Sequence, residues 1–145
     1  DLGDITLFKQ SVIEFLERGM INHQRKNILK QLETRMEKDP DILAVILYGS
    51  YARGEEARDV DLCLILYPDK LKNSLDKRIE YSYHEQVDVQ VFQDLPLYIR
   101  PRVIKEGIVR HVKDEDLLYD IAIETAREFE LYRPKYELYL GSIGK

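Results

Sequence analysis

Two aspartates separated by one residue open an apolar segment in the middle of the chain. Asp59 and Asp61 begin the run DVDLCLIL. Side chains alternate between the two faces of a strand, so the two carboxylates share one face while Val60 and Leu62 point to the other. Magnesium is a hard cation that is usually held by one or two carboxylates together with substrate phosphates. The pair therefore predicts a magnesium site that serves phosphoryl or nucleotidyl transfer.

A third carboxylate, Asp88, lies in the alternating segment VDVQVFQ. Val87 and Val89 point to one face of this predicted strand, and Asp88 and Gln90 point to the other. If the strand lies beside the one that begins at Asp59, all three aspartates converge. Three close carboxylates repel one another without cations, and two-metal sites hold their ions roughly 3.5–4 Å apart. The trio therefore predicts two magnesium ions, and removing the metal is expected to abolish catalysis.

A Gly-Ser turn, Gly49 and Ser50, directly follows an apolar strand, and Arg53 comes three residues after the serine. Together with the aspartates, this turn and its arginine suit the binding of a metal-chelated triphosphate. Tyr48 and Tyr51 flank the turn. Two interpretations of these tyrosines are open: they pack in the core, or they stack on the base or ribose of a nucleotide.

The elements around these residues predict an α+β fold, a short mixed sheet flanked by helices. We expect the helices on one face of the sheet and the aspartates on the other. Apolar residues at helical spacing predict two helices in residues 1–38, joined at Gly19 as an N-terminal helical hairpin. The hairpin is either a brace on the sheet or a surface for a partner or for self-association. Strands are predicted at 42–48, 60–67, 87–92 and 108–112, and helices at 50–54, 71–81, 94–107 and 114–132.

The chain reads as a single domain, residues 1–145, with a core at 41–133 and a C-terminal tail at 134–145. Pro134 is expected to end the last helix. The tail is too apolar for a free linker, so we expect it to pack on its own domain or on a partner.

The composition argues against a membrane-spanning protein, a secreted protein and a nucleic-acid-binding protein. Apolar residues make up 44% of the 145 residues and charged residues 34%. We see no apolar run of the roughly 18 residues that a membrane span needs and no secretory signal. The single cysteine, Cys63, fits a packing role and a reducing cytoplasm. A net charge of −5 argues against a nucleic-acid partner.

The succession GS, ARG, DVDL and a later VDV strand resembles the nucleotidyltransferases with a DNA polymerase β-like palm. More closely it resembles the minimal nucleotidyltransferases (MNT) that are often encoded beside HEPN toxins. The resemblance covers residues 41–133 and implies roles for individual residues. Gly49 and Ser50 would hold the triphosphate, Arg53 would support that loop or the phosphates, Asp59, Asp61 and Asp88 would bind metal, and Asp88 would also act as general base.

The resemblance implies transfer of AMP from ATP to a tyrosine of a cognate HEPN toxin, which would make this chain an antitoxin. Two alternatives stay open: an antitoxin that neutralises its partner by docking alone, and a nucleotidyltransferase that modifies a small molecule. Association of the chain with itself is also open. The loop before Asp59 is shorter than the family pattern, and Arg58 stands where the family has a serine. Arg58 would contact a phosphate or pair with Glu55 or Glu56.

Overall fold

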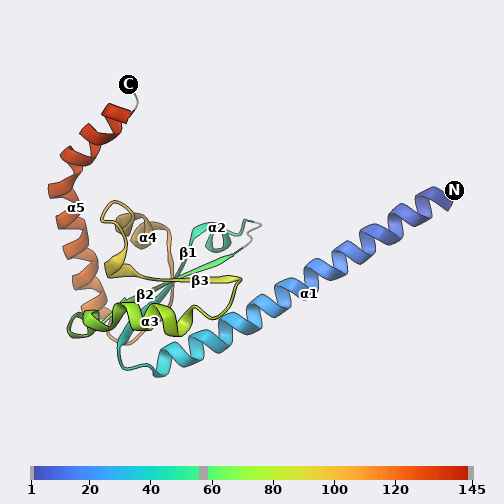
Figure 1. Cartoon of the computed structure of the whole chain (residues 1–145), viewed down its shortest axis with the longest axis horizontal. Helices are drawn as coiled ribbons and strands as arrows, with labels where there is room; N and C mark the ends of the chain where they lie inside the picture. Colours follow the sequence, from blue (N-terminus) through green and yellow to red (C-terminus); the bar gives the residue numbers. More distant parts are fainter. Residues whose placement is uncertain (1, 56–58, 144–145) are drawn as a thin grey trace.

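A mixed sheet forms the centre of the computed structural model, which describes residues 2–55 and 59–143 (Figure 1). Within these residues the sheet has four strands in the order β3-β2-β1-β4. Their bounds are β1 Ile42–Tyr48, β2 Val60–Leu66, β3 Val87–Val91 and β4 Ile108–Val112. β2 and β3 are parallel, whereas β1 runs antiparallel to both β2 and β4. The expected α+β class and the short mixed sheet are confirmed.

Helices connect and flank the strands. The α-helices are α1 Leu2–Lys38, α2 Gly49–Ala52, α3 Ser74–Tyr81, α4 Arg100–Glu106 and α5 Glu115–Ile143. Short 3-10 segments, Pro68–Asn73 (η1) and Phe92–Asp94 (η2), follow β2 and β3. Among the described residues, no helix combines the length and the apolar character that crossing a membrane requires.

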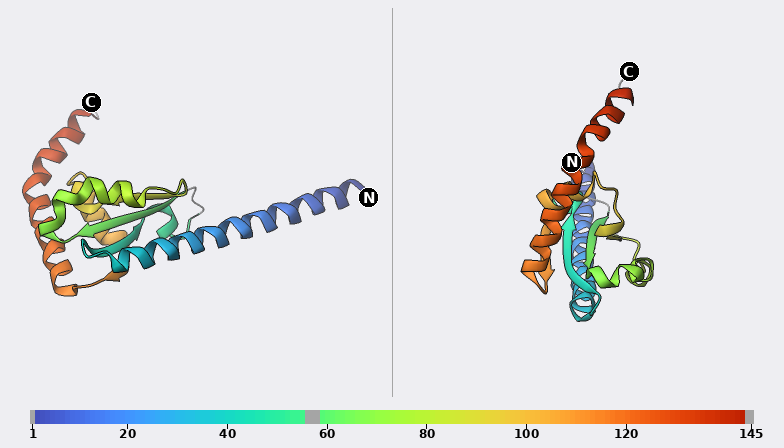
Figure 2. Two further views of the ribbon diagram at one scale, coloured as in Figure 1. Left: turned by 60° about the horizontal axis from the view of Figure 1, so that its bottom comes forward. Right: turned by 90° about the vertical axis from the view of Figure 1, so that its left-hand side faces the viewer.

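Helices cover both faces of the sheet, so the expected one-sided arrangement is wrong (Figure 2). On one face, α1 and α3 pack against the strand residues that include Val60 and Leu62. On the other face, α4 and α5 pack near Cys63 and Ile65. These two residues share the face of Asp61 and are 0% and 1% exposed. Apolar side chains on both faces of β2 need cover on both sides, as burial of apolar surface stabilises the fold.

The N-terminal segment is one continuous helix, α1, instead of the expected hairpin. Both predicted helical stretches are helical, but the chain does not turn at Gly19. Glycine in a helix interior costs only about 1 kcal/mol relative to alanine, so it weakens a helix without ending it. Leu29, Leu32 and Met36 in the second half of α1 pack on the sheet, and the first half extends beyond the sheet (Figures 1 and 2).

The last helix also runs further than expected. Pro134 lies inside α5, which continues to Ile143, so the predicted stop at this proline is wrong. Tyr136, beyond the proline, stacks on Tyr98 with ring centroids 5.1 Å apart. This contact confirms packing of part of the tail on its own domain, whereas Leu138 and Tyr139 are exposed.

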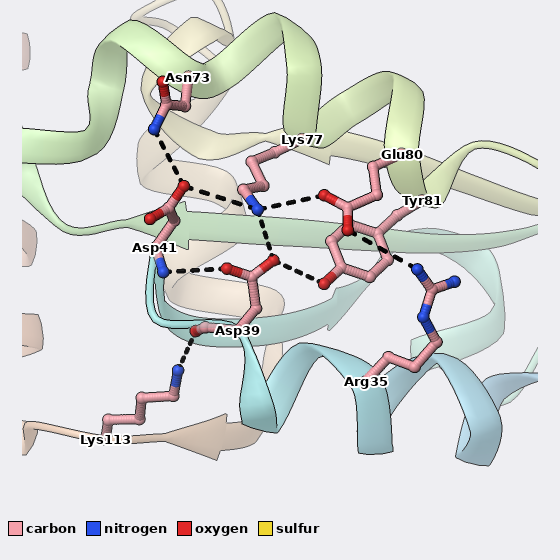
Figure 3. Close-up of polar contacts among 8 residues, drawn as sticks. All are labelled: Arg35, Asp39, Asp41, Asn73, Lys77, Glu80, Tyr81 and Lys113. Atoms are coloured by element: carbon pink, nitrogen blue, oxygen red, sulfur yellow. Dashed lines mark hydrogen bonds and ion pairs between the residues drawn. The ribbon is translucent and has the colours of Figure 1, made fainter.

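A buried polar cluster joins α1 to α3 at the edge of the sheet where β1 begins (Figure 3). Asp39, which is 7% exposed, accepts hydrogen bonds from Lys77 Nζ at 2.8 Å and from the Tyr81 hydroxyl at 2.7 Å. Burial alone would raise the pKa of Asp39. The hydrogen bonds from Lys77, from Tyr81 and from the Asp41 backbone outweigh burial and lower this pKa below its usual value. The cluster therefore favours the charged carboxylate and stabilises the fold.

Further contacts extend this cluster to neighbouring elements (Figure 3). Asn73 donates a hydrogen bond to Asp41 at 3.0 Å. Lys113, just after β4, donates from Nζ to the carbonyl oxygen of Asp39. The start of β1 is thus attached to η1 and to the end of β4, which fixes the position of the strand that leads to the Gly-Ser turn.

Candidate active site

Three strand ends meet at the other edge of the sheet. β1 ends at Tyr48, and β2 and β3 begin at Val60 and Val87. Because β1 is antiparallel to β2 and β2 is parallel to β3, these ends share one edge. Tyr48 lies opposite Asp61 in the ladder, and Asp61 lies opposite Asp88. The sheet therefore brings together residues that are far apart in the sequence.

Asp61 and Asp88 point to the same face of the sheet. Each follows a buried valine, Val60 or Val87, that faces the α1 side, so both aspartates face the opposite side. Burial raises the pKa of Asp61 above its usual value. The negative charges of Asp88 and Asp59 raise this pKa further, and Arg53 opposes them. Carboxylates that repel one another in this way form a favourable environment for a cation.

Asp59 lies just before β2 and is exposed. Its negative charge contributes to the raised pKa of Asp61. Among the described residues, however, no group of three or more His, Cys, Asp or Glu side chains is arranged to hold a metal ion. The three aspartates thus form a shared acidic region and not a complete cage for a metal.

The Gly-Ser turn lies directly against Asp61. Gly49 has a φ of +79° and begins α2. A Cβ atom at this position would be 2.4 Å from Asp61 Oδ2. Only glycine allows both this backbone conformation and this close approach. The turn therefore places backbone groups directly next to the carboxylate of Asp61.

Arg53 connects this turn to α4. Its Nη2 donates a weak hydrogen bond to Ser50 Oγ at 3.4 Å. The same guanidinium forms ion pairs with Glu55 at 3.1 Å and with Glu106 at 3.8 Å. The hydrogen bond with Glu55 raises the pKa of Arg53. Glu106 was not among the residues singled out in the sequence, because no local pattern links the end of α4 to the turn.

The tyrosines beside the turn both contact the core. Tyr48 packs against the cluster under α4 and α5, and Tyr51 against the cluster under α1. Burial raises the pKa of Tyr48, and the neighbouring Cys63, Asp61 and Asp88 raise it further, so the phenol stays protonated. These contacts favour packing over stacking on a nucleotide. Cys63 is fully buried, as its expected packing role requires.

The expected alternatives for Arg58, a phosphate contact or a pair with Glu55 or Glu56, lie outside the described residues. Each of the other residues predicted for the site is described. Those residues are Gly49, Ser50, Arg53, Asp59, Asp61 and Asp88.

A mixed sheet that gathers carboxylates from two neighbouring strands beside a Gly-Ser turn is the arrangement of a nucleotidyltransferase domain. The chain belongs to the polymerase beta nucleotidyltransferase family, whose sequence model matches residues 30–116. This match covers more than half of the chain and includes every residue of the candidate site. The assignment made from the GS, ARG, DVDL and VDV motifs is confirmed.

One curated relative is MJ1547 of Methanocaldococcus jannaschii, a protein assigned as a protein adenylyltransferase. It is 32% identical to this chain over 66 residues. The match covers 44% of this chain and 51% of MJ1547, so the chain spans about half the length of that relative.

Two solved structures have a similar fold. One is a toxin–antitoxin complex with AMP-PNP, with a TM-score of 0.59, 15% identity, and coverage of 82% of this chain and 98% of that chain. The other is the tri-AMPylated Shewanella oneidensis HEPN toxin in complex with the MNT antitoxin. Its TM-score is 0.59 at 14% identity, with 84% and 99% of the two chains covered. At these identities the likeness establishes the fold.

Proposed function

We propose that this chain is a magnesium-dependent nucleotidyltransferase that moves AMP from ATP to an acceptor hydroxyl. The observation that carries the proposal is the position of Asp61, with Asp88 beside it on the next strand and Gly49 against its carboxylate. Carboxylates that could hold a cation and a turn that could hold phosphates therefore lie side by side. Membership of the polymerase beta nucleotidyltransferase family supports the same reaction.

The donor groups at this edge fit magnesium. They are carboxylate oxygens, the ligands that this ion prefers. A complete protein cage is not required, because magnesium usually takes one or two carboxylates and fills its other positions with water and phosphate. Asp61 and Asp88 would hold the ion, and Asp59 would complete a site for two ions. The metal, when bound, would neutralise charge on the triphosphate.

The residues of the chain would then have separate tasks. The Gly49–Ser50 turn would hold the triphosphate, and Arg53 would exchange its carboxylate partners for phosphate oxygens. Asp88 is exposed, so an acceptor could approach it from solvent and give up its hydroxyl proton. The acceptor oxygen would bond to the α-phosphorus while the bond to the β-phosphate oxygen breaks and pyrophosphate leaves. Positioning and charge stabilisation would supply most of the rate enhancement.

The acceptor would be a tyrosine of a HEPN-family toxin, which makes the chain an antitoxin that acts in the cytoplasm. Two comparisons support this choice. MJ1547 is assigned as a protein adenylyltransferase. A solved structure that contains a chain of similar fold is a complex of a tri-AMPylated HEPN toxin with an MNT antitoxin. The net charge of −5 is also more suitable for a protein acceptor than for a nucleic acid.

Neutralisation by docking alone is the second candidate function, and the end of α5 favours it. Leu131, Leu138 and Tyr139 are 84%, 73% and 62% exposed. Large apolar side chains left exposed near the end of a helix can mark a protein-binding site. The same surface would serve an enzyme that must hold its protein substrate, so the two functions need a direct test.

The test is incubation of the chain with magnesium, ATP and the protein encoded by the neighbouring gene, followed by mass spectrometry of both proteins. We expect the partner to gain the mass of AMP on a tyrosine. Label at the α-phosphate of ATP should enter the partner, and label at the γ-phosphate should not.

Asp61→Asn is the control for catalysis, since it should bind the partner but transfer no label. Binding and neutralisation by unaltered chain with no added mass on either protein would support docking instead. Transfer to a small molecule in place of the partner would identify the third alternative.

A further inference from the structure

The first half of α1 carries an apolar surface that the described part of the chain leaves uncovered. We call residues 2–23 of α1 the arm; it extends beyond the sheet in both figures of the whole chain (Figures 1 and 2). Phe8 and Phe15 are 71% and 67% exposed, and Met20 is 63% exposed. The exposed large apolar side chains of the arm that lie on one side are Ile5, Phe8, Val12, Ile13, Phe15, Leu16 and Met20.

Helix geometry determines where this surface points. At 3.6 residues per turn, these seven residues occupy one face about 160° wide. In the second half of α1, Leu29, Leu32 and Met36 pack on the sheet. The centre of the arm's apolar face is turned by about 150° around the helix axis from these packed residues. The face therefore points away from the sheet, and a second helix could lie along it without meeting the body of the chain.

The spacing along this face is that of a coiled-coil seam. Ile5, Phe8, Val12 and Phe15 alternate steps of three and four residues, and the next seam position is Gly19. Glycine is a poor helix former, and among the described parts of the chain a Cβ at Gly19 would meet no atom within 4 Å. Packing within the described chain thus gives no reason for a glycine here. On the seam, Gly19 leaves a gap next to large side chains.

We propose that the arm is a dimerisation element that pairs in antiparallel orientation with the arm of a second copy. In the register that aligns Val12 with Phe15 of the other copy, Phe8 lies opposite Gly19. Phe8 then meets Gly19 and Phe15 meets the smaller Val12, and the two-fold symmetry repeats each contact. This match of the arm to itself favours a second copy over an unrelated partner.

The size and charge of the arm are compatible with such a dimer. Covering the apolar face would bury roughly 600–800 Å² per copy, close to the amount buried per partner in interfaces of standard size. The charged residues of the arm carry both signs, so two arms do not repel strongly. They are Asp4, Lys9, Glu14, Glu17 and Arg18.

Sedimentation equilibrium of the full chain tests the proposal. We expect a dimer at micromolar concentration, and we expect Phe8→Ser combined with Phe15→Ser to weaken dimerisation at least tenfold. Leu7→Ser is the matched control. Leu7 is 70% exposed, about as much as its neighbour Phe8, but it lies on the other side of the helix and should not affect the dimer. A monomeric full chain, or equal weakening by Leu7→Ser, would overturn the proposal.

Disulfide trapping tests the register independently. Cys63 is buried, so introduced cysteines can report on the arm. Mixing Phe8→Cys chains with Gly19→Cys chains should give a crosslinked dimer that neither variant gives alone. Crosslinking of Phe8→Cys with itself would indicate parallel arms and contradict the proposal. The dimer does not depend on nucleotide transfer, so Asp61→Asn should remain dimeric.

Discussion

Gly49 lies so close to Asp61 that a Cβ atom on the glycine would be 2.4 Å from Oδ2 of the carboxylate. We expect Gly49→Ala to reduce AMP transfer by ~100-fold, because it displaces the turn or the carboxylate, and misplacement by about 1 Å has effects of this size. Alanine is also strained at the φ of +79° that Gly49 adopts, so the variant should have a free energy of unfolding lower by about 1–2 kcal/mol. Initial rates and urea unfolding measure the two effects.

Gly54→Ala is the control for this substitution. Gly54 also has a positive φ, +75°, but no atom of the described residues lies within 4 Å of its Cβ position. The variant should lose similar stability and keep most of its activity. Equal loss of activity in both variants would contradict the role given to the contact with Asp61.

Asp61→Asn should abolish stabilisation by magnesium and a non-hydrolysable ATP analogue. For the unaltered chain, ligand at 100 times its Kd should raise the free energy of unfolding by about 2.7 kcal/mol. Without ligand, the variant should be at least as stable as the unaltered chain, because the neutral amide is not repelled by Asp88. Thermal unfolding with magnesium, and again with excess chelator, measures this.

Asp69→Asn provides a comparison with the same chemical change. Asp69 is exposed in η1, which follows the opposite end of β2. This variant should respond to magnesium and nucleotide as the unaltered chain does. If Asp61→Asn responded equally, Asp61 would not be a metal ligand.

Asp39→Asn should reduce the free energy of unfolding at neutral pH by ~2–3 kcal/mol, the range for a buried hydrogen-bonded charge. The pKa of Asp39 is lower in the folded chain than its usual value of 3.8. Its contribution is therefore fully present above this value and is lost as the pH falls through the folded pKa. Urea unfolding across this pH range should show the difference between the variant and the unaltered chain shrinking in acid.

Glu80→Gln is the control within the same cluster. Glu80 also pairs with Lys77, at 3.1 Å, but its side chain is 41% exposed. Exposed ion pairs contribute about 0–1 kcal/mol, so this variant should lose little stability. A loss equal to that of Asp39→Asn would indicate that the buried position of Asp39 is unimportant.

Arg53→Ala should weaken binding of the ATP analogue by about ten- to a hundredfold, the equivalent of a charge-assisted hydrogen bond of ~1.5–3 kcal/mol. Arg53→Lys should restore part of the loss, since lysine keeps the charge but not the planar array of donors. Calorimetric titration with magnesium present measures both affinities.

Glu106→Gln tests whether Glu106 competes with phosphate for Arg53 or holds Arg53 in position. If Glu106 competes with phosphate for the guanidinium, as the 3.8 Å ion pair suggests, the variant should bind the analogue at least as tightly as the unaltered chain. Weaker binding, comparable to that of Arg53→Ala, would show instead that Glu106 holds Arg53 in place.

Local sequence signals predicted the strands and the common face of Asp61 and Asp88. Asp-Pro before β1 and Gly-Ser after it mark the ends of that strand, and alternation around Asp61 and Asp88 gave their common face. The direct pairing of these two aspartates could not be predicted, because it depends on the register between β2 and β3. The contact of Arg53 with Glu106 depends in the same way on how α4 packs.

The wrong predictions, two helix ends and the packing of helices on one face only, share a physical origin: long-range packing outweighs local preferences. Gly19 and Pro134 disfavour a helix locally, but each cost is a few kcal/mol at most, and the helices continue through both residues. The apolar residues of β2 on the aspartate face were assigned to a strand correctly, yet their need for cover by α4 and α5 was overlooked. The partners of Asp39 were missed because they lie in α3, far along the chain.

The two edges of the sheet carry opposite kinds of electrostatics. At the β1 entry, Asp39 meets a positive partner in Lys77, whereas at the β1 exit Asp61 meets a negative neighbour in Asp88. The stabilising ion pair of Asp39 with Lys77 thus lies one strand length away from the two carboxylates that repel each other. Substitutions around the acidic end are therefore expected to leave the buried ion pair of Asp39 and Lys77, and its contribution to the stability of the fold, unchanged.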